Sequence, residues 1–481
     1  MTTSAPETPE IQTLAGITGA LTPEQLLENA DLLSRWRLAV RSALATRHLV
    51  AVASDLSRRF GWQPSALDAL GVPVDLLTCF PDWRDGSRVP FLPGPSGLRF
   101  APSGAAVPLG ILRLQMSPTR GTVPYALLLL RALLHSLDPE TRFVVVVEPG
   151  ADIGALARLA ARFHPGGPSR IRFVPLHCIS VFAQDNARAM RDADANPVLL
   201  VPRAFRSGGA RAEDELDPVD AEHAFGIPVR RSRLYWEGGN VVHDDTRCFV
   251  GVDTVSENVA RLGLSHDEVV SLLAGEFGMP VTTLGRAEAS RYDLADDRQC
   301  SSGQSSFHLD LDIALLGKFG RARRPRALVA DAARGLDFVD DVLGVRRLME
   351  GHFLPAREIR RHLRAEYEAS AETRHPRLLE YASSVAAGGY QVIGVPDLRI
   401  DPKMDVFQRV NLDFGFCNVL PGLRGRKAAV YHFVSGVRAL DADASKRIRH
   451  AGVEPVAVAT AEVASALMQL QGGLHCCCGS L

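Results

Sequence analysis

The chain has 481 residues, of which 46% are hydrophobic and 23% are charged, as in an ordinary globular protein. This length predicts two or three domains of roughly 100–200 residues each. The formal net charge of −1 gives no overall attraction to nucleic acid or to an anionic membrane, so we expect neither as a partner. Arginine greatly outnumbers lysine, a bias that indicates a GC-rich and bacterial genome.

The cysteines predict a reduced, cytoplasmic protein. Five of the 8 cysteines are scattered without the spacing of a disulfide framework or a CxxC motif, and three are adjacent at 476–478. The first residues lack the basic and apolar regions of a signal peptide. The most apolar stretch, from Tyr125 to Leu134, is interrupted by Arg131 and is too short to span a bilayer.

Residues 1–120 are predicted to form an N-terminal extension. Residues 1–20 are polar and rich in Thr, Pro and Ala, which indicates disorder. Apolar positions at helical spacing predict helices over 23–60. Residues 80–124 are rich in Pro and Gly and predict loops and short strands. The sequence assigns no role to this extension.

Residues 121–481 are predicted to form a catalytic α/β domain. The pattern predicts a helix at 125–137, a strand at 143–147, a second helix at 153–163 and a second strand at 171–174. Alternation of helix and strand is typical of the α/β class.

The segment Phe225-Gly226-Ile227-Pro228-Val229 has an echo further along the chain. It recurs at 277–281 as Phe-Gly-Met-Pro-Val, and weaker relatives lie at 389–393 and 452–456. Each copy follows a helical stretch and opens a short strand. A repeat of about 50 residues indicates a propeller of α/β units, but a doubly wound sheet also alternates helix and strand.

Two charged segments follow the repeat. The basic run at 320–327 contains no aromatic residues, so a solvated loop is a better interpretation than a nucleic-acid patch. Residues 355–368 predict a surface helix that begins at Pro355 and carries an Arg364–Glu368 pair four residues apart.

Four short segments carry residue types suited to catalysis. In chain order they are Phe182 to Asn186, Trp236 to Asn240, Phe307 to Asp312, and Gly472 to Cys476. Each has an ordinary alternative when taken singly. Asp185 suits an Asx turn, and Gly238-Gly239 suits a bulge or tight turn. His308 and Asp310 alternate with apolar neighbours, which predicts one face of a strand that solvent alone could cover.

Taken in order, these segments resemble the guanidino-modifying enzymes of the pentein superfamily. That family includes arginine, agmatine and peptidylarginine deiminases and amidinotransferases. The resemblance rests on Asp185, on the Glu237-Gly238-Gly239 turn, on His308-Leu309-Asp310 and on the C-terminal Gly472-Gly473-Leu474-His475-Cys476, which is similar to the G-G-x-H-C of agmatine deiminases. It covers residues 140–481 and implies a five-bladed α/β propeller.

The resemblance implies a role for each residue. Asp185 and Asp310 would bind the planar, cationic guanidinium through charge-assisted hydrogen bonds. Cys476 would attack the central carbon, and positive charge nearby would stabilise its thiolate. His308 would protonate the leaving amine and then activate water, while Glu237 would orient His308. No cofactor and no metal is required.

Three features depart from the family pattern. Asn186 is not the usual residue after the aspartate, which points to a different substrate. Three cysteines stand where one is usual, and the register with Gly472-Gly473 selects Cys476. Asp312 is an additional acid one strand period beyond Asp310, where it would contact either substrate or solvent.

The terminal cysteines have two other interpretations. A zinc site needs converging ligands, whereas adjacent cysteines in an extended chain point to opposite sides. The last four residues formally match a prenylation box, but Gly and Ser are poor at its aliphatic positions and no basic stretch precedes it. A nucleophile at Cys476 accounts for the upstream segments as well.

The predicted function is hydrolysis of a guanidine through a covalent thiouronium intermediate. Amidino transfer to an amine is the first alternative, and a non-catalytic binding protein of the same fold is the second. Arginine, agmatine, a methylated arginine and a peptidyl arginine all stay open as substrates, as does homo-oligomerisation. A nucleophile this close to residue 481 predicts that removing 475–481 abolishes turnover and leaves the protein folded.

Overall fold

The structure is a computed structural model that describes residue 25 and the ranges 97–116, 123–176, 181–202, 218–293, 298–301, 303–345, 356–400, 413–458 and 472–481. The predicted helices at 23–60, apart from Gln25, lie outside the described residues. None of the described helices is both long and apolar enough to cross a membrane.

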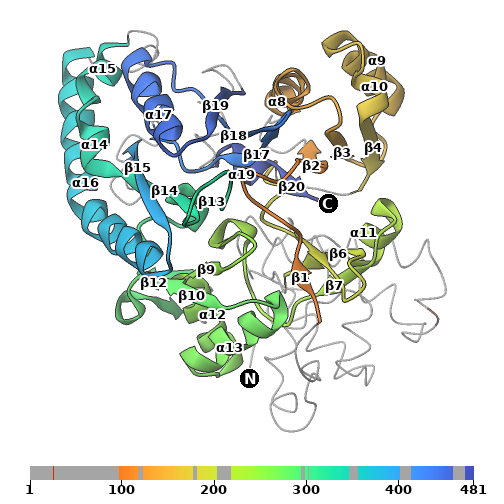
Figure 1. Ribbon diagram of the computed structural model, residues 1–481, viewed down its shortest axis with the longest axis horizontal. Coiled ribbons are helices and arrows are strands. Elements are labelled where there is room, and N and C mark those ends of the chain that lie inside the picture. Colours follow the sequence, from red (N-terminus) through yellow and green to blue (C-terminus); the bar gives the residue numbers. More distant parts are fainter. Residues whose placement is uncertain are drawn as a thin grey trace, which may run out of the picture.

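The first sheet joins residues near both ends of the predicted α/β domain (Figure 1). Its strand order is β20-β2-β3-β4, with β20 antiparallel to β2 and the other neighbours parallel. The strands are β2 (Ile111–Met116), β3 (Arg142–Val147), β4 (Ile171–Pro175) and β20 (Gly479–Ser480). The connecting helices are α8 (Val123–Ser136), α9 (Ile153–Phe163) and α10 (Gly167–Arg170). The helices and strands predicted over 125–174 are therefore confirmed.

The second and third sheets follow along the chain. The second has the order β1-β5-β6-β7, and the third has the order β10-β9-β8. Their elements are β1 (Arg99–Phe100), β5 (Arg188–Arg191), β6 (Pro197–Val201), α11 (Pro218–Phe225), β7 (Val229–Arg231), the 3₁₀ helix η3 (Gly238–Asn240), β8 (Val241–His243), β9 (Cys248–Gly251), α12 (Val252–Leu262), α13 (His266–Phe277) and β10 (Val281–Leu284). A 3₁₀ turn η4 (Ala287–Ala289) leads into a hairpin of β11 (Arg291–Asp293) and β12 (Arg298–Ser301).

The fourth and fifth sheets complete the described part. Their orders are β13-β14-β15-β16 and β17-β18-β19. Their elements are η5 (Leu309–Leu311), β13 (Ile313–Gly317), β14 (Arg326–Asp331), α14 (Ala332–Leu336), α15 (Val339–Gly344), α16 (Ala356–Ala387), β15 (Gln391–Leu398), β16 (Phe414–Gly415), β17 (Leu420–Arg424), β18 (Lys427–His432), α17 (Arg438–His450), β19 (Glu454–Ala457) and α19 (Leu474–Cys477).

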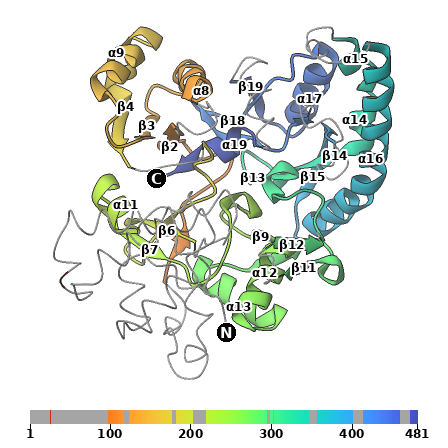
Figure 2. The same cartoon turned by 180° about the vertical axis from the view of Figure 1, so that it is seen from behind.

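One pairing rule recurs in all five of these sheets. An antiparallel pair is followed by a helical crossover to a parallel strand, as in β5-β6-α11-β7 and β17-β18-α17-β19. The first sheet obeys the rule only because β20, from the last described segment, supplies the antiparallel partner of β2. The views from the front and from behind both show the sheets around the middle of the molecule, with helices outside them (Figures 1 and 2).

The echoed sequence segments mark the step from helix to strand. Gly226, Gly278, Gly389 and Gly452 all have φ between 66° and 96°, which is the left-handed region. Each comes within two residues of the end of its helix, where glycine adopts this conformation without the steric cost of a Cβ. The helix-then-strand interpretation of the echo is therefore confirmed for all four copies.

Two predicted segments differ from the structure. The helix predicted at 355–368 continues to Ala387, and Ile359, Leu363 and Tyr367 on it are buried in the core rather than on the surface. The basic run at 320–327 ends inside β14, where Arg326 Nη1 donates to the Ala451 carbonyl at 2.7 Å.

The predicted boundary at residue 120 divides paired strands. β1 pairs with β5, and β2 pairs with β3 and β20, so residues 97–116 belong to the same sheets as the residues after 121. A division between an extension and the α/β part stays a prediction, and these pairings favour a boundary no later than Arg99.

Candidate active site

The four predicted segments converge at the middle of the molecule. Asp185 precedes β5, Glu237 precedes η3, His308 precedes η5, and Cys476 lies in α19. Contacts of η3 with both η5 and α19 bring them together. The reactive atoms of His308, Asp310 and Cys476 all lie within 4.8 Å of one another.

The two glycines of the Glu237-Gly238-Gly239 turn allow its neighbours to approach closely. A Cβ at Gly238 would lie 1.9 Å from the Gln184 carbonyl oxygen, and a Cβ at Gly239 would lie 2.3 Å from His308 Nδ1. The Gly239 amide donates to Asp185 Oδ1 at 3.2 Å, and the Gly238 amide donates to the Asp185 carbonyl at 3.0 Å. These glycines therefore let the Asp185 loop and the His308 ring pack against one turn.

His308 lies between two carboxylates. Its Nε2 is 2.5 Å from Glu237 Oε2, and its Nδ1 is 3.7 Å from Asp185 Oδ1. The imidazole is 1% exposed, so these contacts are shielded from water. The geometry is that of a histidine oriented by an acid, as predicted for Glu237.

His308 and Asp310 do not lie on a strand, so that sequence prediction is wrong. Residues 309–311 form the 3₁₀ helix η5, closed by a hydrogen bond from the Asp312 amide to the Leu309 carbonyl at 2.8 Å, and β13 begins only at Ile313. Leu309 and Leu311 are buried as well. The alternation of polar and apolar residues here therefore belongs to a turn that is buried on all sides, not to a strand. The solvent-facing alternative is excluded, because His308 and Asp310 are at most 2% exposed.

Cys476 is buried at the N-terminal side of the last sheet strand, β20. Its Sγ lies 3.4 Å from Asp310 Oδ2 and 3.0 Å from Asn418 Nδ2. Burial, followed by the charges of Asp310 and Asp185, raises the pKa of the Cys476 thiol well above its usual value. The resting site therefore holds a protonated thiol beside carboxylates.

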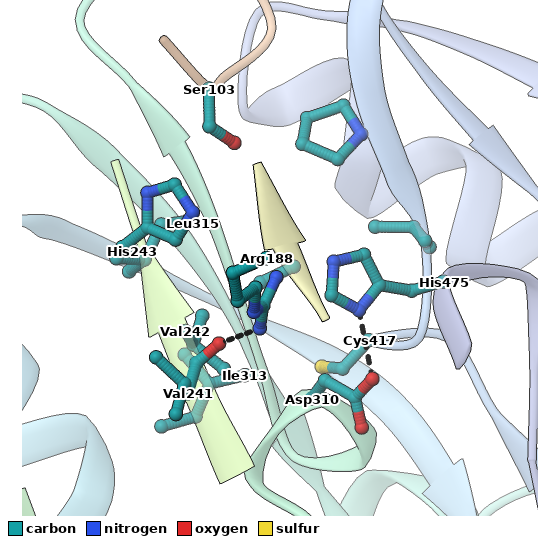
Figure 3. A pocket seen from close by; sticks show the side chains of 13 residues that line it. Ser103, Arg188, Val241, Val242, His243, Asp310, Ile313, Leu315, Cys417 and His475 are labelled. Carbon is teal, nitrogen blue, oxygen red and sulfur yellow. Dashed lines mark hydrogen bonds and ion pairs between the residues drawn. The ribbon is translucent and has the colours of Figure 1, made fainter. Parts of the chain in front are cut away.

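Asp310 is the acid in closest contact with the thiol. Its Oδ2 also accepts a hydrogen bond from His475 Nδ1 at 2.8 Å (Figure 3). Burial by itself would raise the pKa of Asp310, but the hydrogen bond and charge of His475, with the charge of His308, outweigh it and lower that pKa. Asp310 is therefore ionised at neutral pH, as a guanidinium ligand must be.

Asp312 does not face solvent, so the solvent-facing alternative predicted for it is wrong, while a contact with substrate stays a prediction. It is fully buried, and its Oδ1 lies 2.5 Å from Arg399 Nη2 and 3.3 Å from Arg374 Nη2. The same two arginines bind Asp397 at 2.5 and 2.7 Å. The acid one period beyond Asp310 belongs to a buried ion-pair network that supports η5.

Asn186 points away from the other site residues. Its Nδ2 donates to Gln115 Oε1 on β2 at 2.9 Å, and the side chain is 4% exposed. The arrangement attaches the Asp185 loop to the first sheet. A role in substrate choice stays a prediction.

The sequence missed Asn418, Arg188 and the Arg374–Arg399 pair. Arg188 follows Asp185 by three residues and donates to the Gly238 and Val241 carbonyls, which holds the turn that carries Glu237 (Figure 3). Burial lowers the pKa of Arg188 to about 10, so it stays cationic near Asp310 and Asp185. Arg188 carries no spacing signal, because the carbonyls that it binds lie 50 and 53 positions away.

Two described cavities reach the site from the side of β2 where that strand begins. One of about 580 Å³ is lined by the 101–112 segment, Arg188, Arg191, His475 and Ser480. The smaller one, drawn in Figure 3, shares Arg188 and His475 with it and ends at Asp310. Neither cavity has Cys476 or His308 in its lining.

The ligand-type atoms of His308, Asp310 and Cys476 form a group that could hold a metal ion or perform acid–base and nucleophilic chemistry. One nitrogen of the histidine is already engaged, because His308 Nε2 is 2.5 Å from Glu237 Oε2. That the site works without a metal stays a prediction.

Solved structures with the same fold include one described as a putative agmatine deiminase. It aligns with a TM-score of 0.52 at 13% identity and covers 80% of this chain and 97% of that chain. Agmatine deiminases of C. jejuni (TM-score 0.48, 12% identity, 80% of this chain and 95% of that one) and Enterococcus faecalis (0.47, 13%, 82% and 99%) also match.

No protein-family model matches the chain, and no curated protein matches it. At identities this low the similarity extends to the fold alone. The chain therefore shares the fold of the structure described as a putative agmatine deiminase, and membership of the pentein superfamily stays a prediction.

Proposed function

We propose that this protein hydrolyses a carbon–nitrogen bond of a guanidine through a covalent adduct on Cys476. The observation that carries the proposal is the convergence of a buried thiol, a histidine and an aspartate within 4.8 Å, from segments more than 160 residues apart in the chain. The five sheets with one pairing rule would be the blades of a five-bladed propeller, with the site at its axis.

The binding step uses Asp185 and Asp310. Both acids are at most 8% exposed, so a ligand that they bind would be largely shielded from water. A guanidinium presents N–H donors in a planar fork that two carboxylates can accept. The chemistry of the two acids therefore supports a planar cation as the substrate.

The bound guanidinium would also promote ionisation of the Cys476 thiol. In the resting site burial and then the two acids raise the pKa of Cys476, so the thiolate population is small. A guanidinium bound against those acids cancels their field and places positive charge beside the sulfur, which lowers the thiol pKa. Nucleophile formation is thereby coupled to substrate binding.

The covalent step balances with His308 as the proton carrier. His308 takes the proton of the Cys476 thiol, and the resulting thiolate forms a C–S bond to the central guanidinium carbon. The C–N bond then breaks, its electron pair leaves with nitrogen, and protonated His308 gives that nitrogen a proton. His308, oriented by Glu237 at 2.5 Å, next takes a proton from water, which attacks the adduct and releases the thiol. The products are a ureido compound and ammonia or an amine.

A mass-spectrometric substrate screen tests the proposal. Purified protein is incubated with arginine, agmatine, a methylated arginine and an arginine peptide, each with and without an amine acceptor. Replacement of an imino group by oxygen identifies hydrolysis, and Cys476→Ala is the blank. A new guanidine on the acceptor would instead show amidino transfer. Turnover of none of these guanidines would contradict the proposal and leave a binding role.

A further inference from the structure

The side-chain amide of Asn418 contacts Cys476 at two points. Its Nδ2 lies 3.0 Å from the sulfur, and its Oδ1 lies 3.1 Å from the Cys476 backbone nitrogen. Asn418 is 5% exposed and immediately precedes the strand pair β17–β18. The Asn418 amide therefore contacts Cys476 from a position next to the start of β17.

The orientation of this amide is fixed by the protein. The backbone N–H of Cys476 can only donate, so the oxygen of the Asn418 amide must face it. The NH₂ group then necessarily faces the sulfur. Asn418 is thus a hydrogen-bond donor to Sγ.

The two polar neighbours of the sulfur act in opposite directions. Ionised Asp310, 3.4 Å away, can only accept from S–H and therefore favours the thiol. Asn418 donates, and a donor stabilises the charged form of an acceptor. When Asp310 turns to a cationic ligand, the Asn418 bond to the sulfur is retained.

Gly473 makes the close approach of Asn418 possible. A Cβ at this position would lie 2.6 to 2.8 Å from three atoms of the Asn418 side chain, including Oδ1. A Cβ at Gly472 would meet the Phe182 ring at 2.0 Å. The paired glycines before the nucleophile therefore have separate tasks, and the second admits the amide.

We infer that Asn418 is a catalytic residue whose amide donates a hydrogen bond to the Cys476 thiolate and fixes the direction of Sγ. The amide itself loses no proton. The inference about the sulfur rests on the geometry alone, and its consequence for turnover rests on the proposed function.

Alkylation of Cys476 tests the inference without any substrate. Iodoacetamide reacts with thiolate, so its rate at one pH reports the thiolate population. The background is Cys477→Ala/Cys478→Ala, and mass spectrometry of the C-terminal peptide reads the modification. We expect Asn418→Leu and Asn418→Ala to slow alkylation at pH 8.5 about tenfold, which is one unit of thiol pKa.

The controls distinguish a change in the thiol pKa of Cys476 from a general loosening of the packing around the sulfur. Cys417→Ala shortens the buried side chain next to Asn418 in the chain and leaves the Asn418 amide in place, so its rate should match the background. A cavity at position 418 would speed alkylation by admitting reagent, which is the opposite direction. Circular dichroism confirms that each variant is folded. Alkylation of both folded Asn418 variants at the background rate or faster would overturn the inference.

Turnover provides a second readout if the guanidine screen succeeds. Because Asn418 touches the nucleophile rather than the proposed guanidinium ligands, kcat should fall by about tenfold or more with KM little changed. Equal kcat in Asn418→Leu and the parent would also overturn the inference. Failure of the screen leaves the alkylation result intact, so the two proposals fail separately.

Discussion

At the residue scale, the nucleophile lies in surroundings that oppose its own ionisation. Cys476 is 1% exposed, and its closest charged neighbour is an aspartate. Burial first, and then the charges of Asp310 and Asp185, raise the pKa of this thiol, and in the proposed mechanism the bound cation cancels the effect of those two charges. Adjacent cysteines offer a direct comparison, since Cys477 and Cys478 are equally buried but make no hydrogen bond to a site carboxylate in the described structure.

Cys476→Ala is expected to abolish turnover, while Cys477→Ala retains it within a few fold. Only Cys476 has its sulfur within reach of Asp310 and near His308. The measurement is ureido product formed per enzyme, with folding checked by thermal unfolding. Full activity in Cys476→Ala together with loss in Cys477→Ala would show that the register is wrong.

Glu237→Gln is expected to lower kcat by about 10²–10⁴-fold, the contribution of an oriented acid–base group. The substitution keeps the shape and a hydrogen-bonding atom at the 2.5 Å contact with His308, but removes the charge that favours imidazolium. Steady-state kinetics on the best substrate measure it. Glu380→Gln, in an exposed ion pair with Arg286, is the matched control. Equal kcat values for the two variants would show that Glu237 has no role in catalysis.

At the scale of elements, two 3₁₀ turns position the site. Glu237 directly precedes η3, and His308 directly precedes η5, which contains Asp310. Buried arginines hold each turn in addition to its own backbone hydrogen bonds. Arg188 binds the carbonyls of η3, and Arg399 Nη2 donates to the Leu311 carbonyl of η5 at 3.1 Å. Short turns gain little stability alone, so these side chains determine their geometry.

Arg399→Met is expected to destabilise the fold by about 3–5 kcal/mol, the usual cost of breaking a buried ion pair. It leaves Asp312 and Asp397, both at most 1% exposed, with Arg374 as their remaining cation in this network. Urea unfolding measures it. Arg364→Met, in an exposed pair with Asp340, should change stability by no more than about 0.5 kcal/mol. Equal effects of the two substitutions would contradict this account.

The loss of unfolding free energy caused by Arg399→Met should become smaller at acidic pH. Burial alone would raise the pKa of Asp397, but the charges of Arg374 and Arg399 outweigh it and lower that pKa below 3.8. A carboxyl with a lowered folded-state pKa stabilises the fold above its unfolded pKa of about 3.9, and this contribution is lost as the pH falls through the folded value. Unfolding of parent and variant should therefore converge between about pH 4 and pH 2. A constant difference over that range would exclude Asp397 as the cause.

At the scale of the whole molecule, the last residues close the first sheet. β20 pairs with β2 through Leu112–Ser480 and Arg113–Gly479, and the Leu481 amide donates to the Ile111 carbonyl at 3.2 Å. Cys476 to Cys478 are packed in the same core as β2, β3 and α8. The expectation that removing 475–481 leaves the protein folded therefore changes, because that deletion removes core as well as nucleophile.

Removal of 479–481 alone should destabilise the protein by roughly 2 kcal/mol, since two or three net hydrogen bonds of about 1 kcal/mol each are lost. It should also reduce turnover, because β20 fixes the position of α19 and Cys476. Thermal unfolding and product formation measure the two effects. Unchanged stability and activity would show that the sheet closes without β20.

Part of the architecture was predictable from local pattern. The helices and strands over 125–174 and the four helix-to-strand glycine steps were correct, because periodicity and a glycine in the left-handed region act within a few residues. The strand predicted for 308–310 was wrong, since alternation alone cannot distinguish a strand from a turn buried on every side. The length of α16 was underestimated because its buried face is interrupted by polar residues.

The sequence by itself determined the set of reactive residues, because residue types identify the thiol, imidazole and carboxylate groups and the order of their motifs in the chain indicates how they could act together. Only the tertiary structure decided which of them meet. It brought Cys476 next to Asp310, moved Asp312 into an ion-pair network, and added Asn418 and Arg188. The physical reason is that a hydrogen bond acts over about 3 Å, whereas its partners here are 50 to 166 positions apart in the chain.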